Sequence, residues 1–250
     1  MTLTKSAREV IIGLTLVVIF ATVCYAVFGS VDYDADWSTF WDRRSTLFSG
    51  WLVTVAVSLV GLIIAASLAI LLVAGQRAGS TVLRRFCQGY IELVRGTPLL
   101  VHVYIGFYIL ADAFQLTDRF WVGSIILAAF SAAYLAEIIR GGIESIASSQ
   151  REASLAVGFT EFQTYRFVII PQTVRRILPA VTGEFANLIK NSSLLSIISI
   201  SEFTKEIRDA QSITYATFEL YLPLALGYLL LTIPIALVAR NLESRFAYES

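Results

Sequence analysis

Six long apolar segments, separated by polar connections, run through this chain and predict six membrane-spanning helices. A helix needs about 20 apolar residues to cross a bilayer core roughly 30 Å thick, and each segment approaches that length. The predicted spans are residues 10–28, 51–74, 90–111, 120–140, 177–201 and 220–239. Prolines inside several spans predict kinked helices that pack against one another. The expected fold class is therefore an all-α membrane protein.

The first apolar segment, 10–28, follows Lys5 and Arg8 as the core of a secretory signal peptide would. It is longer than the usual apolar core of such a signal, and it ends in Ala26, Val27 and Phe28, which is a poor cleavage site. We therefore expect it to be a transmembrane helix.

The connection between the fourth and fifth predicted spans, residues 149–179, carries local folding signals. Ser149 and Glu152 have the S-x-x-E spacing of a capping box, which predicts the start of a short helix. Gly158 predicts the end of that helix, because glycine accepts the left-handed conformation that a helix C-terminus often needs. A connection with such signals is too structured for a passive linker, and we expect it to be a docking surface.

A second short helix is expected later in the same connection. Thr160 and Gln163 repeat the capping spacing at its start, and Pro171 is expected to end it. Its apolar face would consist of residues at positions i, i+3 and i+7, namely Phe162, Tyr165 and Ile169.

The distribution of basic residues predicts the orientation of the chain. Most of the arginines and lysines lie in the two terminal segments and in the connections 77–88 and 141–178. By the positive-inside rule these parts are cytoplasmic, so both termini and the connection 149–179 face the cytoplasm. The outer segments are more acidic, and the connection 201–219 is long enough for a small outer helix.

Composition excludes several classes of function. The chain is 56% hydrophobic and 15% charged, whereas soluble domains average roughly 45–50% and 25%. Its formal net charge is zero, so there is no basic excess to bind nucleic acid. Cys24, Cys87 and the single histidine, His102, are too few and too separated to form a metal or redox site.

The chain contains no recognisable catalytic motif. It has neither a nucleophile elbow nor a zinc-protease motif, and it lacks the Gly-rich loop that cradles nucleotide phosphates. If ATP drives this protein, the ATPase must be another polypeptide.

Ionisable groups within predicted spans are costly and usually face a cavity or a partner. Glu137, Arg140 and Glu144 lie on one helix face at the end of the fourth span. The structural interpretation, favoured here, is a set of ion pairs that holds helix ends together. The functional interpretation is a gate whose partners change during transport.

A second polar group lies in the fifth span, where Glu184 is followed by Lys190, Asn191, Ser192 and Ser193. One charge with several hydrogen-bonding side chains suits a polar zwitterion, but close helix packing would use the same residues. Both interpretations stay open. Glu184 and Lys190 are six positions apart and should not pair with each other.

The third group is Arg95, Gly96, Thr97 and Pro98 at the start of the third span. Thr97 before Pro98 predicts a capped helix start, with Arg95 at the level of the lipid headgroups. His102, one turn later, is expected to be a packed or hydrogen-bonded group rather than a proton relay.

These motifs resemble those of a known family. Glu152-Ala153-Ser154, Gly158 and 168–171 have the spacing of the EAA loop of ABC importer permeases. Ser154 replaces the third alanine of that motif, and Val168 and Ile170 are further conservative departures. The stretches 95–100, 136–143 and 188–194 are similar to the polar amino-acid subfamily, the histidine, glutamine and glutamate type permeases.

The resemblance implies a type I importer fold with a five-helix core in residues 49–250, preceded in 1–48 by an additional N-terminal helix and an outer segment. It also implies that the loop 149–179 couples the chain to a separate ATPase dimer, which binds the ATP and Mg²⁺ while this chain binds no cofactor. The implied coupling residues are Glu152, Ala153, Ser154, Gly158, Phe159 and Pro171. The candidates for the substrate path are Glu137, Lys190, Asn191, Ser192 and Ser193.

The further partners that the resemblance implies are a second permease, either another copy or a homologue, and an extracytoplasmic amino-acid-binding protein. The expected location is the bacterial cytoplasmic membrane. A secondary transporter driven by an ion gradient is the alternative, and it predicts an inverted repeat and broken helices near the midplane. A membrane-embedded enzyme comes third.

Overall fold

In a computed structural model of the chain, the described residues are 33–247 together with 14–15, 18–19, 22–23, 25–26 and 29. Within these ranges the secondary structure is helical and contains no β-strand, which confirms the predicted all-α class. The chain divides into two compact units, Met1–Trp37 and Ser38–Ser250. The predicted first span, 10–28, lies for the most part outside the described residues, as do Lys5, Arg8 and Cys24.

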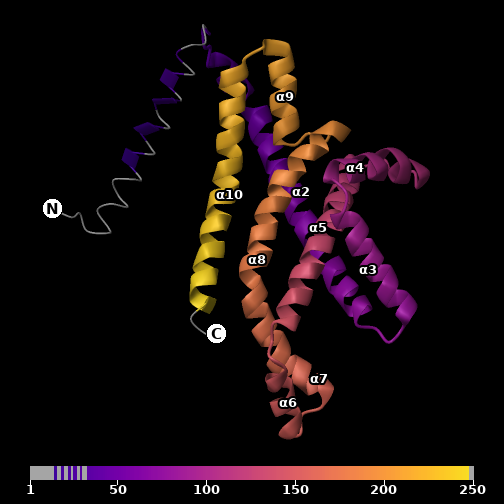
Figure 1. Cartoon of the computed structure of the whole chain (residues 1–250). Coiled ribbons are helices and arrows are strands. Elements are labelled where there is room, and N and C mark those ends of the chain that lie inside the picture. The colour runs from indigo at the N-terminus through magenta and orange to yellow at the C-terminus, as the bar shows by residue number, and fades with distance from the viewer. Residues whose placement is uncertain are drawn as a thin grey trace, which may run out of the picture. The chain divides into compact units, whose positions relative to one another are not determined.

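Helices α2, α5, α8 and α10 of the second unit lie side by side, with α6 and α7 at one end of this bundle and α9 at the other (Figure 1). Three short segments have non-α geometry: η1 and η2 are wide π-helical turns, and η3 is a tight 3-10 helix. The elements in order are α2 (Ser38–Gln76), α3 (Thr81–Arg95), α4 (Leu99–Tyr104), η1 (Ile105–Ala111), α5 (Arg119–Glu144), α6 (Ser148–Ala156), α7 (Glu161–Thr164), η2 (Tyr165–Ile169), α8 (Ile170–Asn191), η3 (Ser192–Ile198), α9 (Phe203–Thr214) and α10 (Thr217–Ala247).

Three of the described helices, α2, α5 and α10, are long and apolar enough to cross a membrane. They confirm the second, fourth and sixth predicted spans. Helix α3 together with α4 and η1 makes a fourth span if the bent pair is counted as one.

The third predicted span is wrong as a single helix that begins near residue 90. Helix α3 begins at Thr81, and the chain bends by 109° between α3 and α4. Pro98 explains the break, because it has no N–H to donate and disfavours helical geometry in the residue before it.

The fifth predicted span, 177–201, is wrong in its limits. Helix α8 begins at Ile170, and after Asn191 the chain continues as the 3-10 helix η3. Helix α8 does not have the apolar composition of a membrane span, in contrast to α2, α5 and α10. Its charged residues explain this, since it carries Arg175, Arg176, Glu184 and Lys190.

Two helices that pack against each other, α2 and α5, bury small side chains in the main apolar core. Ala65 and Ala69 of α2 and Ala128 and Ala132 of α5 are fully buried. Small residues let helix backbones approach closely, and packing of this kind holds helices together within lipid.

The connection between η3 and α10 contains α9, which confirms the predicted small helix in 201–219. Glu202 begins this helix by accepting hydrogen bonds from the backbone N–H groups of Thr204 and Lys205, at 2.9 and 2.8 Å. A second core, which includes Leu47 of α2 and Ile207 of α9, holds α9 against the bundle.

Candidate functional site

The first helix of the loop 149–179, α6, ends as expected but begins differently. Gly158 has a φ of +90°, and the N–H of Phe159 donates to the carbonyl of Ser154 at 3.1 Å, which is a Schellman ending. The predicted capping box is wrong, because α6 begins at Ser148 after Ala147 with no side-chain cap. Ser149 therefore lies inside the first turn, and the carboxylate of Glu152 is exposed.

The second helix of the loop begins as predicted. Thr160 and Gln163 form a complete capping box, with hydrogen bonds of 3.3 and 2.8 Å. The prediction that Pro171 ends this helix is wrong, because helical backbone continues through η2 into α8 with Pro171 in the first turn of α8. The wide turn of η2 directly precedes the proline, where the missing N–H and the ring bulk disturb a regular helix.

The apolar face predicted for this second helix is only partly buried. Ile169 is buried and Tyr165 is half-buried, but Phe162 is 76% exposed. The wide turn of η2 explains the difference, because it changes the angular spacing of side chains from that of an α-helix. Val157 and Phe167 are also largely exposed, so the loop presents apolar side chains on its surface.

Side-chain contacts tie the two short helices of the loop together. Arg151 of α6 forms an ion pair with Glu161 of α7. The Ser154 hydroxyl lies 3.0 Å from the hydroxyl of Thr164, and both residues are buried. Because these contacts join α6 to α7 at two points, the loop forms a compact unit.

Further contacts tie the loop to the bundle. Arg176 of α8 donates to the backbone carbonyl of Ser145, just after α5, at 2.6 Å. Arg77, just after α2, donates to the hydroxyl of Tyr165 in η2 at 3.2 Å. The loop is therefore fastened to the same ends of α2, α5 and α8.

A cavity of about 550 Å³ lies between α4, α5 and α8. It is lined by Leu99, Phe130, Tyr134, Glu184, Asn187, Lys190, Asn191 and Leu194. We call it the membrane cavity. Its charged and amide side chains come from α8, where the side-chain amide of Asn187 lies 3.4 Å from the carboxylate of Glu184.

Two of the predicted path residues, Lys190 and Asn191, line the membrane cavity, while Ser192 and Ser193 are not among its lining residues. The hydroxyls of these two serines donate to backbone carbonyls, at 2.7 and 2.8 Å. Glu184 and Lys190 line the same cavity without forming an ion pair, as their spacing predicted.

Two of the lining residues, Asn187 and Tyr134, were not predicted from the sequence. A signal for Asn187 exists, because Glu184, Asn187 and Asn191 lie at i, i+3 and i+7 and so share one face of α8. Tyr134 belongs to α5, and the sequence carries no signal that brings it opposite α8.

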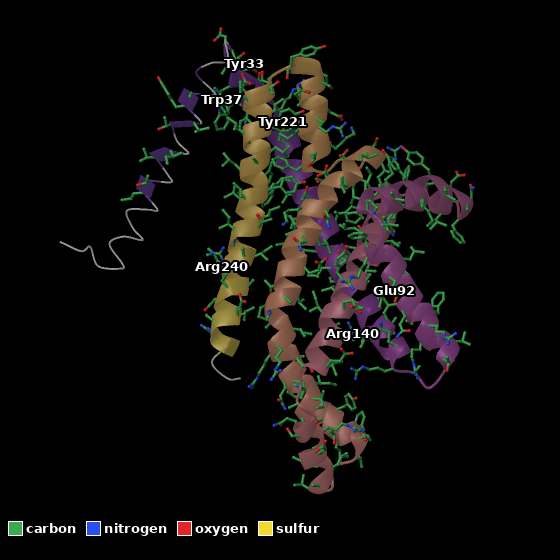
Figure 2. The ribbon with its side chains drawn as sticks, in the orientation of Figure 1. Tyr33, Trp37, Glu92, Arg140, Tyr221 and Arg240 are labelled. Atoms are coloured by element: carbon green, nitrogen blue, oxygen red, sulfur yellow. The ribbon has the colours of Figure 1, made fainter. Side chains whose placement is uncertain are left out.

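Glu137 lies in a separate polar cluster at the loop end of the bundle. Arg140 contacts Glu137 at 2.9 Å and Glu144 at 2.6 Å, which confirms the predicted ion pairs. Arg95 of α3 also contacts Glu137, at 3.0 Å, so the cluster joins α3 to α5. Figure 2 shows Glu92 of α3 and Arg140 of α5 in this region.

The predicted cap at Thr97 is wrong. Pro98 occupies the capping position of α4, and the Thr97 hydroxyl instead donates to the carbonyl of Leu93 in α3 at 2.8 Å. His102 lies 3.1 Å from the Pro98 carbonyl and packs edge-on against Phe130, so it is a packed, hydrogen-bonded group as expected.

Comparison with known proteins identifies the family. Residues 61–248 match the family described as "Binding-protein-dependent transport system inner membrane component". The chain is 33% identical over 214 residues to the glutamine transport system permease protein GlnP of Escherichia coli (strain K12), covering 84% of this chain and 97% of that protein. It is 35% identical over 156 residues to the probable glutamine ABC transporter permease protein GlnM of Bacillus subtilis (strain 168), covering 62% and 72%.

Two solved transporter structures are also similar to this chain. A structure described as an amino acid ABC transporter with histidines matches with a TM-score of 0.78 and 30% identity, covering 85% of this chain and all of that one. An inward-facing structure of the MetNI methionine ABC transporter matches with a TM-score of 0.62 and 19% identity, covering 80% and 98%, and supports the fold alone. These likenesses confirm the predicted type I importer fold and a transport subunit rather than an enzyme. The chain belongs to the family of binding-protein-dependent inner-membrane transport components, as a permease of an amino-acid ABC importer.

Proposed function

We propose that the loop 149–179 docks on a separate ATPase dimer and transmits its movement to the membrane helices. The observation that carries this proposal is the exposure of Val157, Phe162 and Phe167 on a loop whose backbone is otherwise well ordered by caps and side-chain contacts. Exposed apolar side chains grouped on one element are typical of a protein interface. ATP and Mg²⁺ are bound by the ATPase, and this chain binds no cofactor.

The loop is stiff enough to transmit force. Its two helices are joined by the Arg151–Glu161 ion pair and by the buried hydroxyls of Ser154 and Thr164. Its C-terminal end continues directly into α8, and Arg176 ties this end to the residue that follows α5. Displacement of the loop therefore moves α5 and α8, the helices that line the membrane cavity, as alternating access requires.

The transported molecule is a polar amino acid that passes through the membrane cavity. Glu184 and Lys190 supply one negative and one positive charge, and Asn187 and Asn191 add amide groups that donate and accept hydrogen bonds. This set suits the ammonium and carboxylate of a zwitterion. Glutamine is the first substrate to test, because the relatives GlnP and GlnM are named for its transport.

The remaining candidates of the substrate path have different places. Ser192 and Ser193 begin η3 directly after α8, and they act by fixing the backbone next to Lys190. Glu137 lies at the loop end of the bundle, where it pairs with Arg95 and Arg140 and acts as part of a gate.

The working assembly contains a second permease, as another copy or a homologue, the ATPase dimer and an extracytoplasmic amino-acid-binding protein. It resides in the bacterial cytoplasmic membrane with both termini in the cytoplasm. Helix α9 lies at the end of the bundle opposite the coupling loop and so faces outward, toward the binding protein (Figure 1).

Docking is tested by co-purification from detergent of the tagged permease with its ATPase. Phe162→Glu places a charge in the apolar surface and should abolish co-purification. Ile213→Glu is the matched control, because Ile213 is 67% exposed on α9 at the opposite end. If the ATPase is recovered equally with both variants, the docking proposal fails.

The substrate path is tested with the reconstituted importer. Lys190→Met removes the positive charge of the membrane cavity and should reduce substrate-stimulated ATPase activity while the complex still assembles. Arg240→Met, which removes an exposed positive charge from α10 outside the cavity, should leave the stimulation near that of the wild type. Unchanged stimulation in Lys190→Met would rule out this path.

A further inference from the structure

A second cavity, of about 470 Å³, lies at the loop end of the bundle and is distinct from the membrane cavity. It is lined by Gln76, Arg77, Gln88, Ile91, Glu92, Arg95, Glu137, Arg140 and Glu144. We call it the cytoplasmic cavity. The coupling mechanism proposed above uses its ion pairs but does not explain why a polar space exists there.

The cytoplasmic cavity contains polar groups without partners. The side-chain oxygen of Gln76 is buried and accepts no hydrogen bond from the described residues. Within residues 33–247, the carboxylate of Glu92 forms no ion pair or hydrogen bond. A buried acceptor without a donor is unfavourable, so the Gln76 oxygen points to a donor that a bound molecule would supply.

Some charged side chains of the cavity form ion pairs with each other, and two of them do not. Arg95 and Arg140 are paired with Glu137 and Glu144. The available charges are the carboxylate of Glu92 and the guanidinium of Arg77, whose described contact is a hydrogen bond to the uncharged hydroxyl of Tyr165.

One available charge of each sign, together with the amides of Gln76 and Gln88, is complementary to a molecule that carries both an ammonium and a carboxylate. A guanidinium binds a carboxylate through two parallel hydrogen bonds. An ammonium donates three hydrogen bonds, and acceptors for them are the Glu92 carboxylate and the Gln76 oxygen.

The two cavities adjoin at one pair of residues. The guanidinium of Arg95, which lines the cytoplasmic cavity, lies over the ring of Tyr134 at 5.7 Å from its centroid. The same ring lines the membrane cavity. The Arg95–Tyr134 contact therefore lies between the membrane cavity and the space on its cytoplasmic side.

We propose that the cytoplasmic cavity binds the imported amino acid, as a free zwitterion, from the cytoplasmic side and that its occupation slows import. The ammonium contacts Glu92 and Gln76, and the carboxylate contacts Arg77. This site rests on the proposed transport function, because its ligand is the transported product.

The position of Arg77 explains why occupation slows import. Arg77 follows α2 and donates to Tyr165 in the coupling loop, while Glu92 belongs to α3. A zwitterion held between Arg77 and Glu92 links the end of α2 and the loop to α3. The loop must move for each transport cycle, so this added link favours one conformation over the other.

The experiment uses the complete importer in proteoliposomes loaded with increasing concentrations of L-glutamine, with import driven from outside. The lumen also contains ATP and Mg²⁺, and each variant is normalised to its own import rate without luminal glutamine. We expect luminal glutamine to slow wild-type import, and Glu92→Gln to raise the half-inhibitory concentration about tenfold or more, since one charge-assisted contact is lost. Glu243→Gln, which changes an exposed glutamate of α10 outside the cavity, should behave like the wild type.

The proposal is overturned if luminal glutamine does not slow wild-type import, or if Glu92→Gln is inhibited at the wild-type concentration. A wild-type importer that transports no polar amino acid would instead contradict the transport function.

A binding measurement that does not depend on transport completes the test. Gln88→Cys, with both native cysteines changed to serine, places a thiol in the cavity wall for reaction with a maleimide. L-Glutamine should slow this reaction in the detergent-purified complex, while N-acetyl-L-glutamine, which lacks the ammonium, should not. Equal reaction rates with and without L-glutamine would overturn the site even if import is normal.

Discussion

The contact between α5 and α8 next to the loop 149–179 depends on one of two adjacent glycines. A Cβ atom added at Gly142 would approach Cγ2 of Ile177 to well under 3.0 Å, and it would lie 3.3 Å from Cγ2 of Thr173. A Cβ added at the neighbouring Gly141 meets no atom within 4 Å. We therefore predict that Gly142→Ala is less stable than Gly141→Ala.

The size of the difference follows from two terms. Alanine is about 1 kcal/mol more favourable than glycine inside a helix, and both variants gain this term. Only Gly142→Ala adds overpacking, which costs about 1–3 kcal/mol in a well-packed contact. Ile177 cannot relieve the clash easily, because a β-branched side chain in a helix strongly prefers one rotamer.

The assay is thermal denaturation of the detergent-purified complex. The midpoint shifts by about 2–4 °C per kcal/mol for a chain of this size, so the two variants should differ by several degrees. Gly141→Ala should melt at or above the wild-type temperature, and Gly142→Ala should melt below Gly141→Ala.

A second substitution tests the cause of the difference. Ile177→Ala, added to Gly142→Ala, removes the clashing methyl and leaves Cβ at 3.6 Å, so part of the loss should be restored. If Gly142→Ala and Gly141→Ala melt together, the close approach of α5 and α8 at this point is refuted.

Three further predictions concern local structure. Gly158→Ala should destabilise the loop 149–179 by about 1–2 kcal/mol, because residue 158 has a left-handed backbone, and Gly158→Asn should destabilise it by less. Less ATPase should therefore co-purify with Gly158→Ala than with Gly158→Asn, and equal recovery would contradict this. Ser154→Ala should lower the free energy of unfolding by about 1–3 kcal/mol, because the buried Thr164 hydroxyl loses this partner. The double variant Ser154→Ala with Thr164→Val should melt closer to the wild type, and a double variant less stable than the single one would refute the pairing. Glu202→Ala should destabilise α9 by about 1 kcal/mol, because the helix loses its N-terminal cap. Amide hydrogen exchange should become faster in α9 alone, and exchange at the wild-type rate would show that the cap contributes nothing to stability.

The sequence by itself determined the features that depend on local spacing. The capping box at Thr160, the left-handed Gly158 and the ion pairs of Arg140 all join residues within one or two helical turns. The apolar lengths of α2, α5 and α10 likewise identified them as membrane spans. Such features are encoded in consecutive residues, and so they could be predicted without the fold.

Small shifts in helix limits defeated other local predictions. The S-x-x-E spacing at Ser149 is a capping box only if the helix begins at Gln150, and α6 begins two residues earlier, at Ser148. The wide turn η2 moved Phe162 away from the face of Ile169. Both depend on how the loop packs, which spacing alone does not contain.

Only the tertiary structure decided which distant residues meet. It brought Arg95 of α3 to Glu137 of α5, placed Tyr134 opposite the polar face of α8, and pressed Gly142 against Ile177. It also set the 109° bend between α3 and α4, where Pro98 predicts a break but not its angle. These contacts join different helices, and their geometry follows from how the helices cross rather than from the order of residues within any one of them.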